Sequence, residues 1–154
     1  MKRFLTHATT TAVVLVAATS IAAAGEVGGH NFVVSNPPTT SELPSGITYT
    51  SVGNHQVFTT SDSSHPLNRS SGDCSGACVA DADGNTTCMG SCSIVDTDGD
   101  LAFFTWDGQN EGHWWLKGGT GKYAKASGQG DWKADAVYAG GITGNSWQGT
   151  IDME

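Results

Sequence analysis

Positively charged residues are scarce in this chain of 154 residues, where 7 Lys and Arg face 15 Asp and Glu and the net charge is −8. Proteins that bind nucleic acid or anionic lipid headgroups need clustered basic side chains, so the charge balance argues against both classes. Charged residues of either sign make up only 14% of the chain, which excludes a charge-rich disordered protein. The length suits one globular domain.

A long hydrophobic run is also missing after residue 24, and no lipid-attachment cysteine follows that position, so we expect no membrane anchor. The start of the chain has the three parts of an export signal: basic Lys2 and Arg3, an apolar stretch at 12–18, and small residues at 22–24. The sequence therefore predicts a signal peptide over residues 1–24, cleaved near Ala24, and an exported protein. A buried N-terminal helix is the alternative.

Helical periodicity is absent after the leader, whereas 21 glycines mark frequent turns between short segments of period-2 patterning. This pattern predicts an all-β fold built from hairpins. A small closed antiparallel barrel of about eight strands is favoured because closure removes exposed strand edges. We expect an irregular lead-in at 25–46, rich in Pro, Ser and Thr, with pairing of residues 31–34 at a sheet edge as the alternative, and a barrel domain at 47–154. Within the barrel, Gly53-Asn54 should join a hairpin of strands 47–52 and 56–60, followed by a loop at 61–73.

The four cysteines are arranged symmetrically about Asp83. A three-residue hairpin loop ending at Gly84 would place Cys78 opposite Cys88 and Cys74 opposite Cys92, at Cα distances that suit disulfides. An even cysteine count in an exported chain favours disulfides over zinc. We expect these two nested bridges, with other pairings and a zinc site as the alternatives.

Two acidic segments, residues 81–85 and 96–100, resemble the start of a calcium-binding loop. Their sixth positions are Thr86 and Leu101 instead of the glycine that an EF-hand requires. Asp-Gly hairpin turns are therefore the favoured interpretation, and a surface calcium site is the alternative. The histidines His30, His55 and His65 lack ligand spacing, so we expect no metal site and no cofactor.

The most specific segment is GGTGKYAKASGQGDW at residues 118–132. It fails the phosphate-loop pattern, which requires Ser or Thr after the lysine and a following helix. It resembles the GGTGKYAGxxGxG hairpin of the allene oxide cyclase barrel-like proteins, which share a barrel with plant dirigent proteins, and in particular their exported bacterial members. Lys125 replaces a glycine that is usual in that family. The structural turn glycines of this segment are Gly118, Gly119, Gly121, Gly128 and Gly130.

The resemblance covers about residues 88–150 and implies an eight-stranded antiparallel barrel, often oligomeric, with an apolar cavity. Some members of the family are cyclases or isomerases, dirigent proteins steer a coupling, and many bacterial members have no assigned activity. A homo-oligomer is therefore one expectation to test. The hairpin motif identifies the barrel and carries no catalytic residue that can be transferred to this chain.

Aromatic residues provide the candidate ligand contacts. Core packing is the alternative for each, because eight strands can be filled by side chains alone. Weaker catalytic candidates come from the alternating segment 113–117 and the turn before it, where an inward polar face could orient a ligand or move a proton. A solvated outer face is the alternative for these. The candidate ligand contacts are Trp106, Trp115, Trp132, Trp147 and Tyr138, and the catalytic candidates are His113, Lys117, Glu111 and Asp107.

These observations support two functions. The first is an exported barrel that binds a small, largely apolar molecule and that, if it is an enzyme, acts as a cyclase or isomerase by holding one conformer. The second is a non-catalytic envelope or extracellular protein with a filled barrel. An avidin-like ligand binder is a weaker third reading. A cavity of at least about 300 Å³ that contains one of the catalytic candidates would favour the first function.

Overall fold

Nine strands and two short 3-10 helices follow one another in the part of the chain that the computed structural model describes, residues 24–153. The leader predicted at residues 1–24 lies outside the described residues, apart from Ala24. No helix among the described residues is long and apolar enough to cross a membrane. The elements are β1 Gly25–Ser35, β2 Thr39–Glu42, η1 Pro44–Gly46, β3 Thr48–Thr60, β4 Ser71–Ala80, β5 Thr86–Val95, β6 Leu101–Asp107, β7 Glu111–Gly119, η2 Gly121–Tyr123, β8 Ser127–Val137 and β9 Ile142–Asp152.

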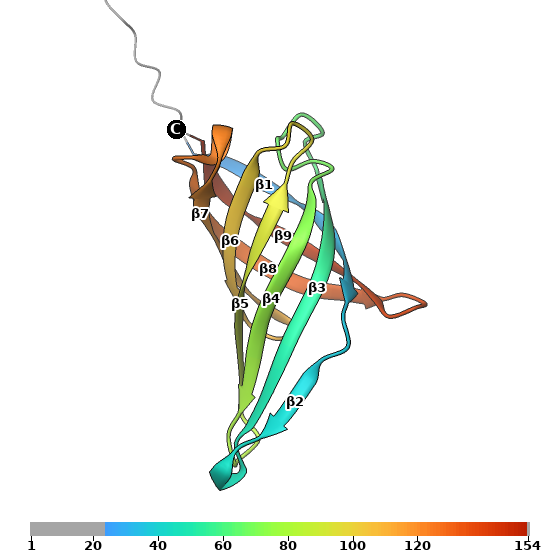
Figure 1. Ribbon diagram of the computed structural model, residues 1–154. Coiled ribbons are helices and arrows are strands. Elements are labelled where there is room, and N and C mark those ends of the chain that lie inside the picture. The colour runs from blue at the N-terminus through green and yellow to red at the C-terminus, as the bar shows by residue number, and fades with distance from the viewer. Residues whose placement is uncertain (1–23, 154) are drawn as a thin grey trace, which may run out of the picture.

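The sheet closes on itself (Figure 1). Its strand order is β1-β9-β8-β7-β6-β5-β4-β3, and β1 pairs antiparallel with β3 as well as with β9. Asn31 of β1 accordingly lies opposite Asn145 on one side and Phe58 on the other. Eight strands thus form a closed antiparallel barrel, with β2 as an extra strand against β3. The predicted fold class is confirmed.

The expectation of an irregular lead-in at 25–46 is wrong for its first part. Residues 25–35 form β1, the strand that seals the barrel, because both of its edges find partners in β9 and β3. Pro37 and Pro38 follow β1, where a residue without a backbone N–H interrupts the ladder. The chain then pairs again with the first half of β3 through β2.

The predicted hairpin at Gly53-Asn54 is also wrong, because β3 runs without a break from Thr48 to Thr60. Gly53 lies opposite Ser75 of β4, and Asn54 lies opposite Cys74 on that side and Ser35 of β1 on the other. Pairing with neighbours on both sides outweighs the local turn tendency of this dipeptide.

The hairpin of β4 and β5 has the predicted disulfides. Cys74 is bonded to Cys92 and Cys78 to Cys88, and each pair is directly opposed in the strand register. Gly84 closes the loop between the strands with a φ of +86°, in the region that favours glycine. The two bridges are typical of proteins that fold in an oxidising, exported environment.

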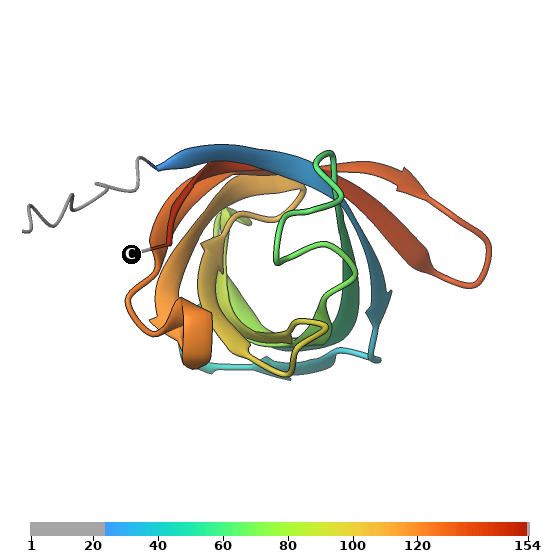
Figure 2. The same cartoon turned by 90° about the horizontal axis from the view of Figure 1, so that it is seen from above.

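One end of the barrel is filled by side chains. The segment between β3 and β4 folds inward over this end (Figure 2) and places Leu67 in the interior with 2% of its surface exposed. The side chains packed with it come from β1, β6, β7, β9 and the segment around η2. They are Val27, Ala102, Trp114, Leu116, Tyr123, Ala126, Trp147 and Ile151. The core therefore closes one end of the barrel and leaves the other end free.

Candidate functional site: a cavity inside the barrel

A cavity of about 650 Å³ occupies the barrel interior. It reaches from Leu67 at the filled end to Pro38, Thr86 and the β6–β7 turn at the other end. Pro38 and Thr86 are exposed to solvent, so the cavity opens between the β4–β5 hairpin, β2 and this turn. The volume lies within the range of about 300–1,000 Å³ that is usual for small-molecule sites.

Aromatic rings form a continuous wall at the inner part of the cavity. Phe104, Trp114, Trp147 and Phe58 contact one another in that order, edge to face, with successive ring centroids 5.9, 6.0 and 6.0 Å apart. Trp106, the next inward residue of β6 after Phe104, extends the wall. Each ring fixes its neighbours, so the wall is preformed and rigid.

Two indoles of the cavity are held by backbone carbonyls. Nε1 of Trp114 donates to the oxygen of Asp131 at 3.2 Å, and Nε1 of Trp132 donates to the oxygen of Asp107 at 2.9 Å. The Nε1 atoms of Trp106 and Trp147 are buried without an acceptor among the described residues. Packing against other rings holds Trp147 in place.

Four amide side chains, here called the amide cluster, line the cavity on β1, β3 and β9, next to Phe58 and Trp147 of the wall: Asn31, Asn54, Gln56 and Asn145. Nδ2 of Asn31 donates to Oε1 of Gln56, and Nε2 of Gln56 donates to Oδ1 of Asn54 at 2.9 Å. Asn31 and Asn145 are 4% and 8% exposed. Sequence reasoning missed this cluster entirely.

None of the described residues that line the cavity has an ionisable side chain. The cysteines among them are oxidised in disulfides, and the remaining polar groups are amides, hydroxyls and indoles. A charged ligand would lose its hydration without gaining a counterion, which is unfavourable. The cavity is therefore suited to an uncharged molecule and offers no side chain for general acid–base chemistry.

The predicted ligand contacts divide into two groups. Trp106, Trp132 and Trp147 line the cavity. Trp115 lies on the outer face of β7, since its neighbour Trp114 points inward, and Tyr138 is 52% exposed and packs against Phe32 on the outside. Because side chains alternate along β7, Trp114 lines the cavity in place of its neighbour Trp115. Trp114 is not among the predicted ligand contacts.

The four catalytic candidates do not line the cavity, so the hypothesis of an inward polar face is corrected. His113 and Lys117 share the outer face of β7, where Nδ1 of His113 lies 3.0 Å from Oδ1 of Asp107 and Lys117 lies over the ring of Trp115. Glu111 is exposed at the start of the strand. The face of β7 that carries Trp114 and Leu116 points inward instead. Burial of these two apolar side chains is more favourable in free energy than burial of the polar face would be.

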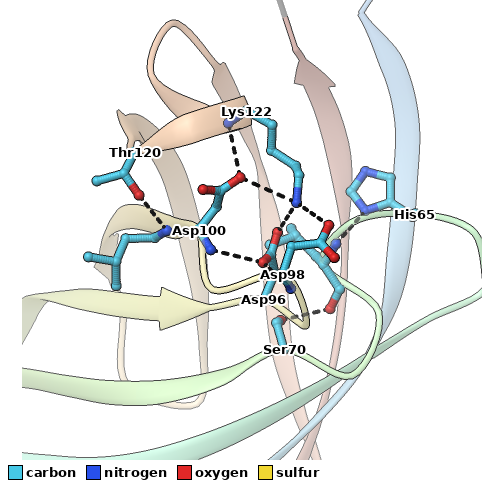
Figure 3. Close-up of polar contacts among 9 residues, drawn as sticks. His65, Ser70, Asp96, Asp98, Asp100, Thr120 and Lys122 are labelled. Carbon is cyan, nitrogen blue, oxygen red and sulfur yellow. Dashed lines mark hydrogen bonds and ion pairs between the residues drawn. The ribbon is translucent and has the colours of Figure 1, made fainter.

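The second acidic segment forms a turn that is tied to the glycine-rich segment (Figure 3). Oδ1 of Asp96 accepts hydrogen bonds from the backbone N–H groups of Asp98 and Asp100, at 2.8 and 3.0 Å. Nζ of Lys122 lies 2.6, 2.7 and 3.4 Å from carboxylate oxygens of Asp96, Asp98 and Asp100. The lysine occupies the space between the carboxylates, which favours the hairpin-turn interpretation over the calcium site. Among the described residues, no group of His, Cys, Asp and Glu is arranged to hold a metal ion.

The pKa values of this group follow from its contacts. Burial alone would raise the pKa of Asp96, but hydrogen bonds from Lys122 and from the backbone of Asp98 and Asp100 outweigh burial and hold this pKa below its ordinary value. The side-chain contacts with Asp96 and Asp98 raise the pKa of Lys122. Burial raises the pKa of Tyr123 next to it.

The turn glycines lie where a side chain would not fit. Gly118 and Gly121 have φ values of +97° and +49°. A Cβ on Gly119 would lie 1.8 Å from the carbonyl oxygen of Leu101, and Cβ atoms on Gly128 and Gly130 would meet the backbone of β9. These glycines let strands and turns approach closely at the filled end, far from the cavity opening.

The geometry defines a class of protein: a closed antiparallel β-barrel with an uncharged internal cavity. No protein-family model and no curated protein matches the sequence. Among solved structures, the chain is similar to the pterocarpan synthase dirigent protein GePTS1. The two are 15% identical, the match covers 94% of this chain and 98% of the other, and the TM-score is 0.52. The chain thus has a dirigent-like barrel fold.

Proposed function

We propose that this protein binds a small, uncharged, largely apolar molecule inside its barrel. The observation that carries the proposal is the cavity of about 650 Å³ whose described lining residues carry no charge and include a preformed aromatic wall. The cavity exceeds the volume of about 300 Å³ expected for a ligand-binding barrel, which disfavours a filled barrel, but it contains none of the four catalytic candidates and so supports binding alone. The two disulfides and the predicted leader support an exported protein as the setting of this function.

An allene oxide cyclase-like cyclase or isomerase activity is the second candidate. It is supported by the resemblance of residues 118–132 to that family and by the fold shared with a protein named as a pterocarpan synthase. Because no lining side chain among the described residues is ionisable, such catalysis would consist of holding one reactive conformer against the aromatic wall. Assembly of the barrel into a homo-oligomer stays a prediction.

The test of binding uses N-phenyl-1-naphthylamine, a neutral probe whose emission increases in apolar surroundings. We expect saturable binding by the native protein, and binding weakened about tenfold or more by Ala80→Trp, which places an indole in the cavity mouth. Val79→Trp is the matched control, because Val79 is the adjacent residue on the outer face and is 43% exposed. Equal binding by the two variants, or no binding by the native protein, would refute the proposal.

A further inference from the structure

The amide cluster has an unusual position for polar side chains, and its ligand chemistry can be inferred if the proposed function holds. Asn31 and Asn145 lie directly opposite each other on β1 and β9, both pointing inward and both more than nine-tenths buried. The neighbours of Asn31 on β1, His30 and Phe32, are both exposed, and the apolar Phe32 is 42% exposed. With Asn31 inside and Phe32 outside, β1 buries less apolar surface than it would with the reverse arrangement. This indicates that the polar side chain inside the barrel has a role other than packing.

Part of the hydrogen-bonding capacity of the cluster is unused. The relay from Asn31 through Gln56 to Asn54 engages one Nδ2 hydrogen of Asn31 and leaves its Oδ1 without a donor among the described side chains. The side-chain amide of Asn145, a residue that is 8% exposed, borders the cavity and has no side-chain hydrogen bond to a described residue. Neither this amide nor Oδ1 of Asn31 belongs to the buried atoms that lack a partner, so both stay accessible from the cavity and can hydrogen-bond to a ligand there.

Two aromatic rings of β6 lie across the cavity from Asn31. In the closed strand order, β6 is the fourth strand from β1 in an eight-stranded ring, so Phe104 and Trp106 face the side that carries the amide cluster. A molecule between β6 and β1 therefore meets the rings of Phe104 and Trp106 on one side and the amide of Asn31 on the other. Phe58 and Trp147 continue the aromatic wall next to the amide cluster. No described lining residue supplies a charge that could neutralise an ionised group.

We propose that the cavity selects a neutral ligand with a flat, apolar body and a terminal amide-type group that both donates and accepts hydrogen bonds. Asn145 and Asn31 recognise that group, since each side-chain amide offers a donor and an acceptor to an amide partner. Phe104 and Trp106, the part of the aromatic wall on β6, hold the flat body. This inference rests on the proposed binding function and adds the specificity-determining residues.

The test compares three probes with the same ring system: naphthalene, 2-naphthamide and 2-naphthoate, each titrated into the full chain by calorimetry. We expect 2-naphthamide to bind about tenfold more tightly than naphthalene, and 2-naphthoate to bind more weakly than both. The variant Asn145→Leu, which keeps the branching and the number of side-chain heavy atoms of the native residue, should lose about tenfold in affinity for 2-naphthamide and keep its affinity for naphthalene. Thr87→Val, at an exposed position of β5 outside the cavity lining, is the control and should leave both affinities unchanged.

The outcomes separate the two proposals. If naphthalene and 2-naphthamide bind equally and Asn145→Leu changes neither, amide recognition is overturned while binding in the cavity stands. Tighter binding of 2-naphthoate than of 2-naphthamide also overturns it, because that result requires a positive group in the cavity. If no probe binds, both proposals fail. Retained naphthalene binding by Asn145→Leu shows that this variant is folded.

Discussion

Lys122 is the residue that joins the two most distinctive segments of this sequence. Its ammonium lies among three carboxylates of the turn 96–100, and the side chain of Asp96 is 1% exposed (Figure 3). A carboxylate buried to this extent requires a counterion or a proton. The lysine of the glycine-rich segment therefore has a structural role at the filled end of the barrel.

Replacing Lys122 by Met should destabilise the protein, because it leaves the Asp96 carboxylate buried without its counterion. We expect the midpoint of thermal unfolding to fall by roughly 5 °C or more at pH 7. Lys125→Met is the control: it removes the same charge three residues away, from an exposed side chain with no ion pair among the described residues. Equal unfolding temperatures for the two variants, measured by circular dichroism, would contradict this role.

The same group predicts how stability depends on pH. Because the pKa of Asp96 is lowered in the folded state, its ionised form contributes stability above the unfolded pKa of about 3.9, and this contribution is lost as the pH falls through the folded pKa. In Lys122→Met the carboxyl can take up a proton instead of remaining unpaired. The stability difference between Lys122→Met and the native protein should therefore shrink below about pH 4.

At the scale of elements, the β4–β5 hairpin was predicted in detail and β3 was not. The hairpin is a local structure: its loop, its register and its two bridges are set by cysteines and a glycine within 19 residues. The continuity of β3 past Gly53 depends on β1 and β4, which are distant in sequence. Local patterns predict elements whose partners are near in the chain.

The two disulfides should each stabilise the hairpin by about 2–3 kcal/mol, because they close chain segments with sequence separations of 18 and 10 residues. The test compares three variants: the double variant Cys74→Ala and Cys92→Ala, the double variant Cys78→Ala and Cys88→Ala, and the variant with all four substitutions. The bridges are nested, so when one is removed the other still restricts part of the same segment in the unfolded chain. The decrease in the free energy of unfolding on loss of both bridges should therefore exceed the sum of the two separate decreases, as measured by urea unfolding. A sum equal to or above the combined loss would contradict this coupling.

At the scale of the whole molecule, β1 decides whether a cavity exists. It is the only described strand that joins β9 to β3, so it turns an open sheet into a barrel. Without it, β3 and β9 would expose unpaired edges, which are prone to aggregation. The cavity and the pairing of both edges thus depend on the same strand.

Proline in the middle of β1 should open the barrel. Val33 pairs with Gln56 on one side and Thr143 on the other, so Val33→Pro disrupts the seam between β1 and its neighbours. We expect loss of probe binding and a shift to aggregates in size-exclusion chromatography. Ser41→Pro in β2, a strand that pairs only with β3, is the control and should stay soluble and keep its binding. Normal binding by Val33→Pro would contradict the role of β1 as the seal.

The sequence by itself determined the fold class, the nested disulfides and the turn character of the acidic segments, because all three depend on local spacing and period-2 patterning. It did not determine the site. Only closure of the barrel decided which face of each strand points inward: Asn31 lies inside while Phe32 lies outside, and Trp114 lines the cavity while Trp115 does not. Alternation gives two faces to every strand, and the choice between them is made by contacts between strands far apart in the chain.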